Sequence, residues 1–291
     1  MAYEKTTWIS GQTPLSATNL NNIENGIETN SNDITQLSNP NLLINGNFQV
    51  NQRGNEFYFG EEGYTFDRWS VYQLDVSRYL DTIKVSNTFT MSRSIQQRFE
   101  HELNGTYTFS CYVTDIDTTE AYLWAYSDDN STGWVESPTK LQVGLNTWTY
   151  TGNIKCFGIS VPSGANVFLK WCKLEQGSIA TPFVPRPYVE ELAMCQRYYQ
   201  PIDIVAPIIY KYTSKDILCR FNIPIPMRGT PTVKYTTVGT YDTSANVITA
   251  TETTITFASW STVIMRATLP NEIAGSSSAI WSSVGLDAEI Y

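Results

Sequence analysis

The stretch TPLSATNLNNIENGIETNSNDITQL, residues 13–37, is followed after Ser38 by NPNLLINGNFQVNQRG, residues 39–54. In the first stretch, apolar residues and one asparagine recur at alternating steps of three and four. They are Leu20, Ile23, Ile27, Asn30, Ile34 and Leu37. This repeat predicts a short helix with a coiled-coil seam, and isoleucine at both seam positions favours three strands over two. The alternative is a lone surface helix packed on its own domain, since Gly26 costs about 1 kcal/mol in a helix interior.

The second stretch opens a long region of strand patterns. Side chains alternate along two rows, first Tyr107, Phe109, Cys111 and Val113, then Tyr122, Trp124 and Tyr126. Tyr, Trp and Phe make up 13% of the chain and charged residues only 16%, a balance that favours strands over helices. Many strands of similar length separated by turn residues predict a β-sandwich or jelly roll over residues 41–185.

The rest of the chain divides around this domain. Residues 1–40 form a predicted N-terminal segment with the trimerising helix. After the proline-rich TPFVPRP, residues 186–201 are predicted to form a linking helix, and residues 202–291 a C-terminal antiparallel β domain. The predicted fold class is therefore mainly β with two short helices.

The net charge of −9 argues against several kinds of partner. Nucleic acids and anionic membrane surfaces require clustered Lys and Arg, which an acidic chain of this kind does not supply. There is no run of about 18 apolar residues and no secretory signal pattern, so neither a membrane span nor export by such a signal is predicted. The same charge favours a neutral or cationic ligand over a strongly anionic one.

Catalytic and metal signatures are sparse. His101 is the only histidine, and in HELNG the second histidine of the zinc-protease signature is replaced by Gly105. The five cysteines are odd in number and scattered, which predicts buried, reduced thiols rather than disulfides or a zinc site. The sequence therefore predicts no enzyme, although a glycosidase with two carboxylates remains an alternative because such an enzyme needs no sequence signature.

Four segments in order resemble bacteriophage and prophage tail-fibre or receptor-binding proteins. They are WISGQTPLSATNLNNIENGI (8–27), NLLINGNFQVNQRG with YTFDRW (41–69), KLEQGSIATPFVPRPYVEELAMCQRYYQ (173–200) and IPIPMRGTPTV (223–233). The resemblance covers about a third of the residues but brackets the whole chain. The shared motifs belong to the scaffold of these proteins and do not name a receptor.

This resemblance implies a virion tail protein, made in the bacterial cytoplasm, that attaches a phage to its host. It implies a homotrimer whose N-terminal segment binds tail or baseplate proteins and whose β domains face outward. The predicted function is non-catalytic binding of a bacterial surface glycan. A structural tail or baseplate component with no ligand of its own is the alternative.

Aromatic side chains are the candidates for sugar contact, because a flat ring offers a large contact area at low entropy cost. The candidate glycan-binding residues are Trp134, Tyr122, Trp124, Tyr126 and Trp148. A row of three aromatics on one strand face is also typical of a core. Trp134 is predicted to be exposed because its neighbours, DDNSTGWVES, are polar and resemble a loop.

Acidic side chains in two predicted loops suggest one structural metal. Asp115, Asp117, Asp128 and Asp129 provide the oxygen ligands that calcium accepts. The same residue types are common in turns for purely local reasons, and that alternative stays open. No other cofactor is predicted.

Overall fold

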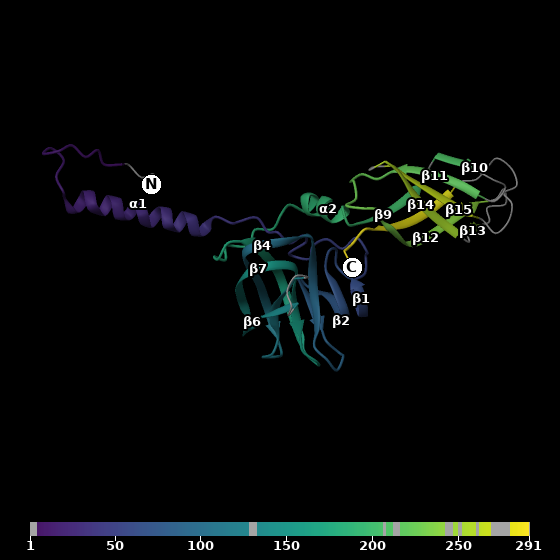
Figure 1. The fold of residues 1–291 in the computed structure, drawn as a ribbon, viewed down its shortest axis with the longest axis horizontal. Helices are drawn as coiled ribbons and strands as arrows, with labels where there is room; N and C mark the ends of the chain where they lie inside the picture. The colour runs from purple at the N-terminus through teal and green to yellow at the C-terminus, as the bar shows by residue number, and fades with distance from the viewer. Residues whose placement is uncertain are drawn as a thin grey trace.

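The computed structural model describes residues 5–127, 133–205, 208–211, 216–241, 247–249, 252–259, 262–268 and 280–290. Figure 1 shows a mainly β molecule in which a lone helix is followed by two β units. No helix in this described part is long and apolar enough to cross a membrane. The fold class predicted from the sequence is confirmed.

The N-terminal helix α1 spans Ala17–Gln36. The Ser16 side-chain oxygen accepts a hydrogen bond from the Asn19 backbone N–H at 3.2 Å, which satisfies one of the free donors of the first turn. The predicted helix is therefore present, with a serine cap at its start.

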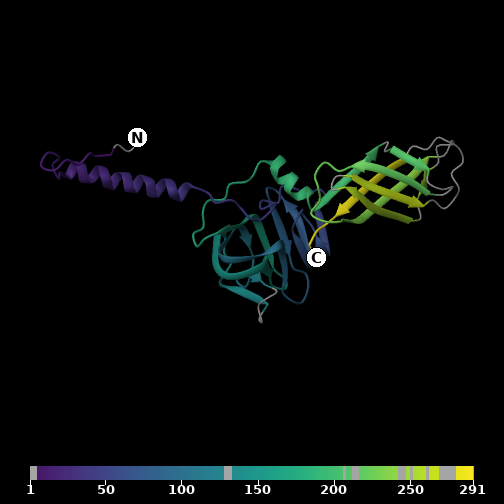
Figure 2. The same ribbon diagram turned by 45° about the horizontal axis from the view of Figure 1, so that its top comes forward.

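Helix α1 projects away from both β units (Figures 1 and 2). Among its seam residues, Leu20, Ile27 and Leu37 keep between 44% and 67% of their surface exposed. Asn30 is exposed as well, Ile23 is half-buried, and the Ile34 side chain lies outside the described residues. The seam is thus an apolar stripe that packs on neither β unit.

The first β unit is a sandwich made from one folded sheet. Its strands are β1 (Phe57–Tyr64), β2 (Ser70–Tyr79), β3 (Thr82–Ser86), β4 (Arg93–Ile116), β5 (Tyr122–Tyr126), β6 (Trp134–Lys140), β7 (Gly144–Val161) and β8 (Asn166–Gln176). They pair in the order β1-β2-β3-β8-β4-β7-β5-β6, and a further pairing of β2 with β4 folds the sheet back on itself. The long strand β4 pairs with β2 in its first part and with β8 in its second, so it runs through both layers.

The core lies between these layers. The predicted alternating row is buried as expected, with Tyr107, Phe109, Cys111 and Val113 all in the apolar core. Cys111, Cys156, Cys172 and Cys195 are buried free thiols, and the side chain of Cys219 lies outside the described residues. Burial raises the pKa of Cys111 to about 12, so this thiol is unreactive at neutral pH.

The YTFDRW motif forms a turn between two strands. Strand β1 ends at Tyr64 and β2 begins only at Ser70. Between them the chain turns, with Arg68 at a φ of 69° and the Trp69 N–H bonded to the Phe66 carbonyl at 2.9 Å. The turn is held because Trp69 is fully buried and donates its Nε1–H to Asn45.

The segment 41–54 packs on the end of the sandwich that faces helix α2 in Figure 1. Buried Asn41 accepts the Leu174 N–H at 2.9 Å and donates to the Cys172 carbonyl at 3.0 Å, which ties the segment to β8. Gly46 lies against the same atoms: a Cβ there would sit 2.5 Å from the Cys172 carbonyl oxygen. Only glycine allows this close approach.

The linker after β8 is anchored by a buried lysine. Lys173 donates from Nζ to Thr181 Oγ1 at 2.7 Å and to the Pro182 carbonyl at 3.0 Å, and it pairs with Glu175 at 3.3 Å. The same ammonium reaches Ser38, just after α1, at 3.2 Å. The linker is therefore fixed along the outer face of β8, and the end of the helical segment is fixed with it.

A group of buried charges joins the two β units. We call it the junction cluster; it comprises Arg53, Asp67, Arg68, Asp287 and Glu289. Arg68 donates to the Glu289 carboxylate, and Arg53 lies 3.6 Å from Glu289. Burial raises the pKa of Glu289, while the positive charges of Arg68 and Arg53 oppose that shift. The charged residues of the YTFDRW and NQRG motifs therefore have a structural role in the junction cluster.

Tyrosines complete this junction. The guanidinium of Arg68 stacks 3.6 Å from the ring centre of Tyr198, and that of Arg53 4.0 Å from Tyr199. Helix α2 (Tyr188–Gln196) ends before these tyrosines, and Tyr199 begins β9. The predicted linking helix is therefore shorter than expected, because its last residues are pinned in the junction.

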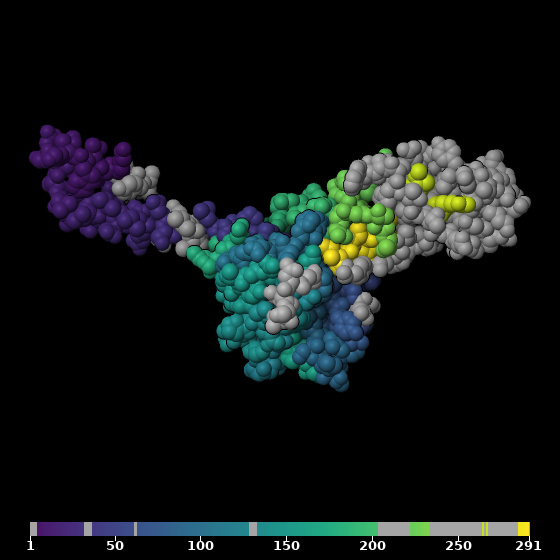
Figure 3. Space-filling view, viewed as in Figure 1, coloured from purple at the N-terminus to yellow at the C-terminus, as the bar shows by residue number. Residues whose placement is uncertain are grey.

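The second β unit contains two four-stranded antiparallel sheets, drawn in green and yellow in Figure 2. The first sheet has the order β10 (Ile208–Lys211), β11 (Asp216–Asn222), β15 (Thr262–Thr268), β14 (Glu252–Ser259). The second has the order β13 (Val247–Thr249), β12 (Thr232–Tyr241), β16 (Ile280–Asp287), β9 (Tyr199–Val205). In the space-filling view of Figure 3, the described atoms of the last residues lie beside the first unit.

Candidate functional site

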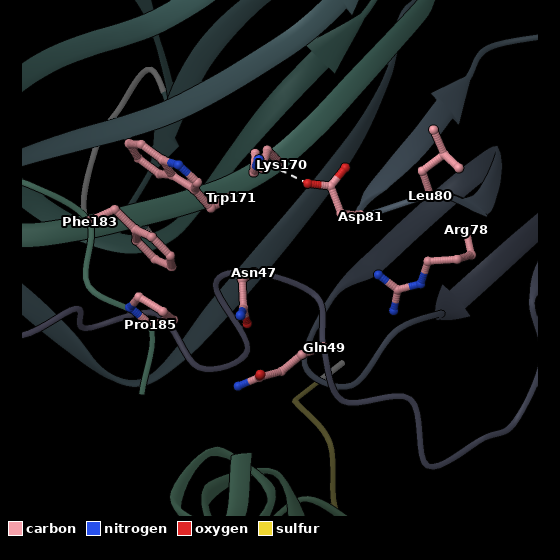
Figure 4. Close-up of a pocket in the computed structure, with 9 residues that line it drawn as sticks. All are labelled: Asn47, Gln49, Arg78, Leu80, Asp81, Lys170, Trp171, Phe183 and Pro185. Carbon is pink, nitrogen blue, oxygen red and sulfur yellow. Dashed lines mark ion pairs between the residues drawn. The ribbon is translucent and has the colours of Figure 1, made fainter. Parts of the chain in front are cut away.

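A pocket of about 570 Å³ opens beside β8 on the outer face of the first β unit. We call it the Trp171 pocket. Its lining comes from four segments far apart in the sequence: Asn47 and Gln49, then Arg78, Leu80 and Asp81, then Lys170 and Trp171, and finally Phe183 and Pro185 (Figure 4). Its volume falls in the range of small-molecule sites, roughly 300–1,000 Å³. The anchored linker forms one wall, so the pocket depends on the fixed position of that linker.

A β-bulge turns Trp171 outward. Tyr112 pairs with Trp171 and Val113 pairs with Leu169, so Lys170 is an extra residue in β8. Leu169 and Cys172 both face the core, and the two residues between them face out. A bulge commonly re-aims a side chain in this way beside a functional site.

Two aromatic rings, Trp171 and Phe183, line the pocket, and a third, Tyr112, lies beside Trp171 outside the lining. We call these three rings the aromatic wall. The rings of Trp171 and Phe183 stack with centres 4.7 Å apart and planes within 4°. Tyr112 is exposed and lies tilted beside Trp171, with ring centres 6.0 Å apart. Figure 4 shows Trp171 and Phe183 together on one side of the pocket.

Polar groups occupy the other side. Lys170 pairs with Asp81 at 2.9 Å, and both side chains are exposed. The hydrogen bond and charge from Lys170 lower the pKa of Asp81, and the same contact raises the pKa of Lys170, so both stay charged at neutral pH. Asn47 and Gln49 add amides that can both donate and accept.

Arg78 is the second cation of the pocket. Its guanidinium lies 4.5 Å from the ring centre of Phe66, and one nitrogen donates to the Phe48 carbonyl. Partial burial lowers the pKa of Arg78, but an arginine remains protonated at any pH the protein meets. In Figure 4 the guanidinium extends into the pocket toward Asn47 and Gln49.

Two of the aromatic residues chosen from the sequence are buried. Trp148 is only 8% exposed and packs edge-on against Phe157 in the core, with ring centres 6.0 Å apart. Trp124 is 2% exposed. Neither offers a surface to a ligand, because both rings are covered by protein atoms.

The other three candidates lie with Trp124 on the outer face of β5 and β6. We call Tyr122, Trp124, Tyr126 and Trp134 the outer aromatic patch. Trp134 is 39% exposed and stacks on Trp124 at 3.9 Å, while Trp124 sits against Gly158, where a Cβ would lie 2.5 Å from the ring. The segment around Trp134 is a strand and not a loop. Trp134 begins β6, which lies at the edge of the sheet and pairs with β5 alone.

Two of the four proposed calcium ligands, Asp115 and Asp117, are described, and both accept local hydrogen bonds. Asp117 accepts two hydrogen bonds from Asn166, both at 2.6 Å, and Asp115 accepts the Ile116 N–H at 2.9 Å. Asp128 and Asp129 lie outside the described residues. Within the described part of the chain, no three His, Cys, Asp or Glu side chains are grouped to hold a metal. Calcium stays a prediction.

No protein-family model matches the sequence, and no curated protein matches it. Solved structures give distant likenesses. The N-terminal CBM22-1–CBM22-2 tandem domain from Paenibacillus barcinonensis Xyn10C is 10% identical, with 86% of this chain and 98% of that chain covered and a TM-score of 0.33. A family 29 carbohydrate-binding module complexed with cellulohexaose is 9% identical over 43% of this chain and 96% of its own, with a TM-score of 0.30. Scores of this size assign neither a family nor a ligand to this chain.

Proposed function

We propose that this protein is a non-catalytic attachment subunit of a phage-type tail that binds a bacterial surface glycan in the Trp171 pocket. The observation that carries the proposal is the aromatic wall facing a polar rim across one pocket. A pyranose ring has an apolar C–H face that packs on flat aromatic rings. Its hydroxyls need donors and acceptors, which Asn47, Gln49 and the Lys170–Asp81 pair supply.

The described lining of the Trp171 pocket holds one carboxylate, which favours binding over hydrolysis. Glycosidases of the common type require two carboxyl groups about 5–10 Å apart. Asp81 is the one carboxylate that lines the Trp171 pocket among the described residues, and it is paired with Lys170. Its lowered pKa also makes it a poor general acid.

The tail assignment rests on the four sequence motifs and on helix α1. The motif residues at the start of the first β unit and in the linker hold the ends of that unit in place, as a shared scaffold would. The seam of α1 leaves apolar side chains in solvent, which favours association with other copies. Three linked copies would raise the effective concentration of weak sugar sites without new contacts.

Replacing Trp171 with alanine is expected to weaken glycan binding at least tenfold, or about 1.4 kcal/mol. The reason is that the substitution removes the largest flat surface of the pocket while leaving the polar rim. Binding of the wild-type chain to an array of bacterial surface polysaccharides would identify a ligand, and titration calorimetry would measure the loss. Thermal unfolding of the variant would check that the sandwich remains folded.

Trp134→Ala is the matched control for that experiment. Trp134 is also a partly exposed tryptophan that stacks on another ring, but it lies in the outer aromatic patch. The proposal expects Trp134→Ala to bind like the wild type. If Trp134→Ala loses binding and Trp171→Ala does not, the outer aromatic patch is the binding site. If the wild type binds no polysaccharide of the array, the result supports the alternative of a structural tail or baseplate component with no ligand of its own.

Replacing Ile27 with glutamate is expected to reduce the assembly from three chains to one. Three carboxylates would meet in the seam, and a buried charge without a partner is strongly destabilising. Light scattering would give a mass near three times 32.8 kDa for the wild type and near one chain for the variant. Asn25→Glu adds the same charge off the seam and should keep three chains; a wild-type monomer would contradict the trimer.

A further inference from the structure

The net charge of the residues that line the Trp171 pocket is opposite in sign to the net charge of the whole chain. The chain carries a net charge of −9, which by itself would disfavour an anionic ligand. The described residues that line the pocket include two cations, Arg78 and Lys170, and one carboxylate, Asp81. Because Asp81 is paired with Lys170 at 2.9 Å, Arg78 is left as the uncompensated charge.

Arg78 takes part in none of the ion pairs formed among the described residues. Glu56 is the carboxylate whose charge acts on it, and it does so from beyond ion-pair distance. The guanidinium is also held in place by the Phe66 ring and the Phe48 carbonyl. A fixed fork with free N–H donors is the geometry that binds carboxylate or phosphate oxygens.

Local charge outweighs net charge at contact distance. The screening length is about 8 Å at physiological ionic strength, so distant acidic residues act weakly on a bound ligand. A group in hydrogen-bond contact with Arg78 lies well within that length, so the charge of Arg78 acts on it directly. The local charge of this pocket therefore favours an anionic group, whereas the net charge of the chain favours a neutral or cationic glycan.

We propose that the Trp171 pocket selects a saccharide that carries an anionic group, a carboxylate or a phosphate, and that Arg78 is the residue that reads it. The sugar ring packs on the aromatic wall, and the anionic oxygens accept hydrogen bonds from the Arg78 fork. Lys170 stays with Asp81 and hydrogen-bonds to hydroxyls. This inference rests on the proposed glycan binding and adds the chemical class of the ligand.

The test compares each acidic saccharide with its neutral form on the full chain. The probes are a uronic acid oligosaccharide and its carboxyl-reduced form, and a phosphate-substituted saccharide and its dephosphorylated form. The wild type is expected to bind at least one acidic form tenfold or more tightly than its neutral partner. Whichever pair shows the preference identifies carboxylate or phosphate as the group read.

Substitutions of the charged pocket residues test which of them recognises the anionic group. Arg78→Gln is expected to abolish the preference for the acidic form, so that the acidic and neutral forms bind the variant within twofold of each other. Asp81→Asn frees Lys170 and should strengthen acidic binding, and Arg78→Lys, which keeps the charge without the fork, should lie between wild type and Arg78→Gln. Arg93→Gln is the matched control, since Arg93 lies outside the pocket beside Gln73 and Tyr72.

The outcomes separate the two proposals. If neutral and acidic forms bind equally and Trp171→Ala abolishes both, the pocket binds glycans but the anionic class is wrong. If Arg78→Gln weakens both forms alike, Arg78 does not read a charge and this inference falls. If the wild type binds none of the probes but binds a neutral polysaccharide of the array, this inference falls and the proposed function stands. If it binds neither the probes nor the array, both fall. Thermal unfolding of each variant confirms that the sandwich is intact.

Discussion

Glu289→Ala is expected to lower the free energy of unfolding by about 3–5 kcal/mol. Glu289 is buried and is the carboxylate that Arg68 contacts directly, with Arg53 at 3.6 Å. Its removal leaves two buried guanidinium groups with only Asp67 and Asp287 nearby, at 3.8 and 4.0 Å from Arg53. Breaking one partner of a buried network is costly because the remaining charge stays desolvated.

Urea unfolding, followed by tryptophan fluorescence, would measure this change. Glu190→Ala provides the control, since Glu190 is an exposed residue of α2 at the same end of the molecule. The control should shift the midpoint little. A loss below about 1 kcal/mol for Glu289→Ala would mean that the junction cluster is hydrated in solution and contributes no more than a surface ion pair.

Gly46→Ala has the second large expected effect, a loss of about 3 kcal/mol of stability. The new Cβ would lie 2.4 Å from Asn41 Nδ2 and 2.5 Å from the Cys172 carbonyl oxygen, both buried. The carbonyl belongs to the backbone of β8, so it cannot move without disturbing the sheet. The Asn41 side chain cannot turn away without leaving the Leu174 N–H unpaired.

The matched control is Gly229→Ala, because a Cβ at Gly229 meets nothing within 4 Å. Its midpoint in urea should stay within experimental error of the wild type. If Gly46→Ala unfolds like the control, the segment 41–54 sits farther from β8 than described here.

The sequence predicted those elements whose side chains repeat with a regular period. The three-four spacing from Leu20 to Leu37 identified α1, and the alternation from Tyr107 to Val113 identified the inner face of β4. These patterns are local, since each depends only on which side of one element meets water. Two of the four motifs, 41–69 and 173–200, proved to be packing sites because their polar residues are bonded inside the molecule.

The pocket could not be located in this way. Its walls come from four segments, and contacts between distant segments leave no local period. One signal was present: the apolar residues of β8 change parity between Val167 with Leu169 and Cys172 with Leu174. That change indicates a bulge and would have placed Trp171 on the outer face.

Trp148 and Trp124 illustrate the opposite error. Aromatic identity alone favoured them as ligand contacts, but one ring fills the core and the other is covered by Trp134. Which aromatic ring remains open depends on the neighbouring strand, and strand order is set by long-range pairing.

The position of the anchors has a mechanical consequence. Lys173 of β8 holds both Ser38 after α1 and the linker at Thr181 and Pro182, and Arg68 holds Glu289 near the C-terminal end. Tension applied between the helix and the second β unit would pass through these side-chain anchors and across the junction cluster. The linker and segment 41–54 lie on that path, and they supply Phe183, Pro185, Asn47 and Gln49 to the Trp171 pocket. Pulling on the molecule would therefore act on the walls of the pocket.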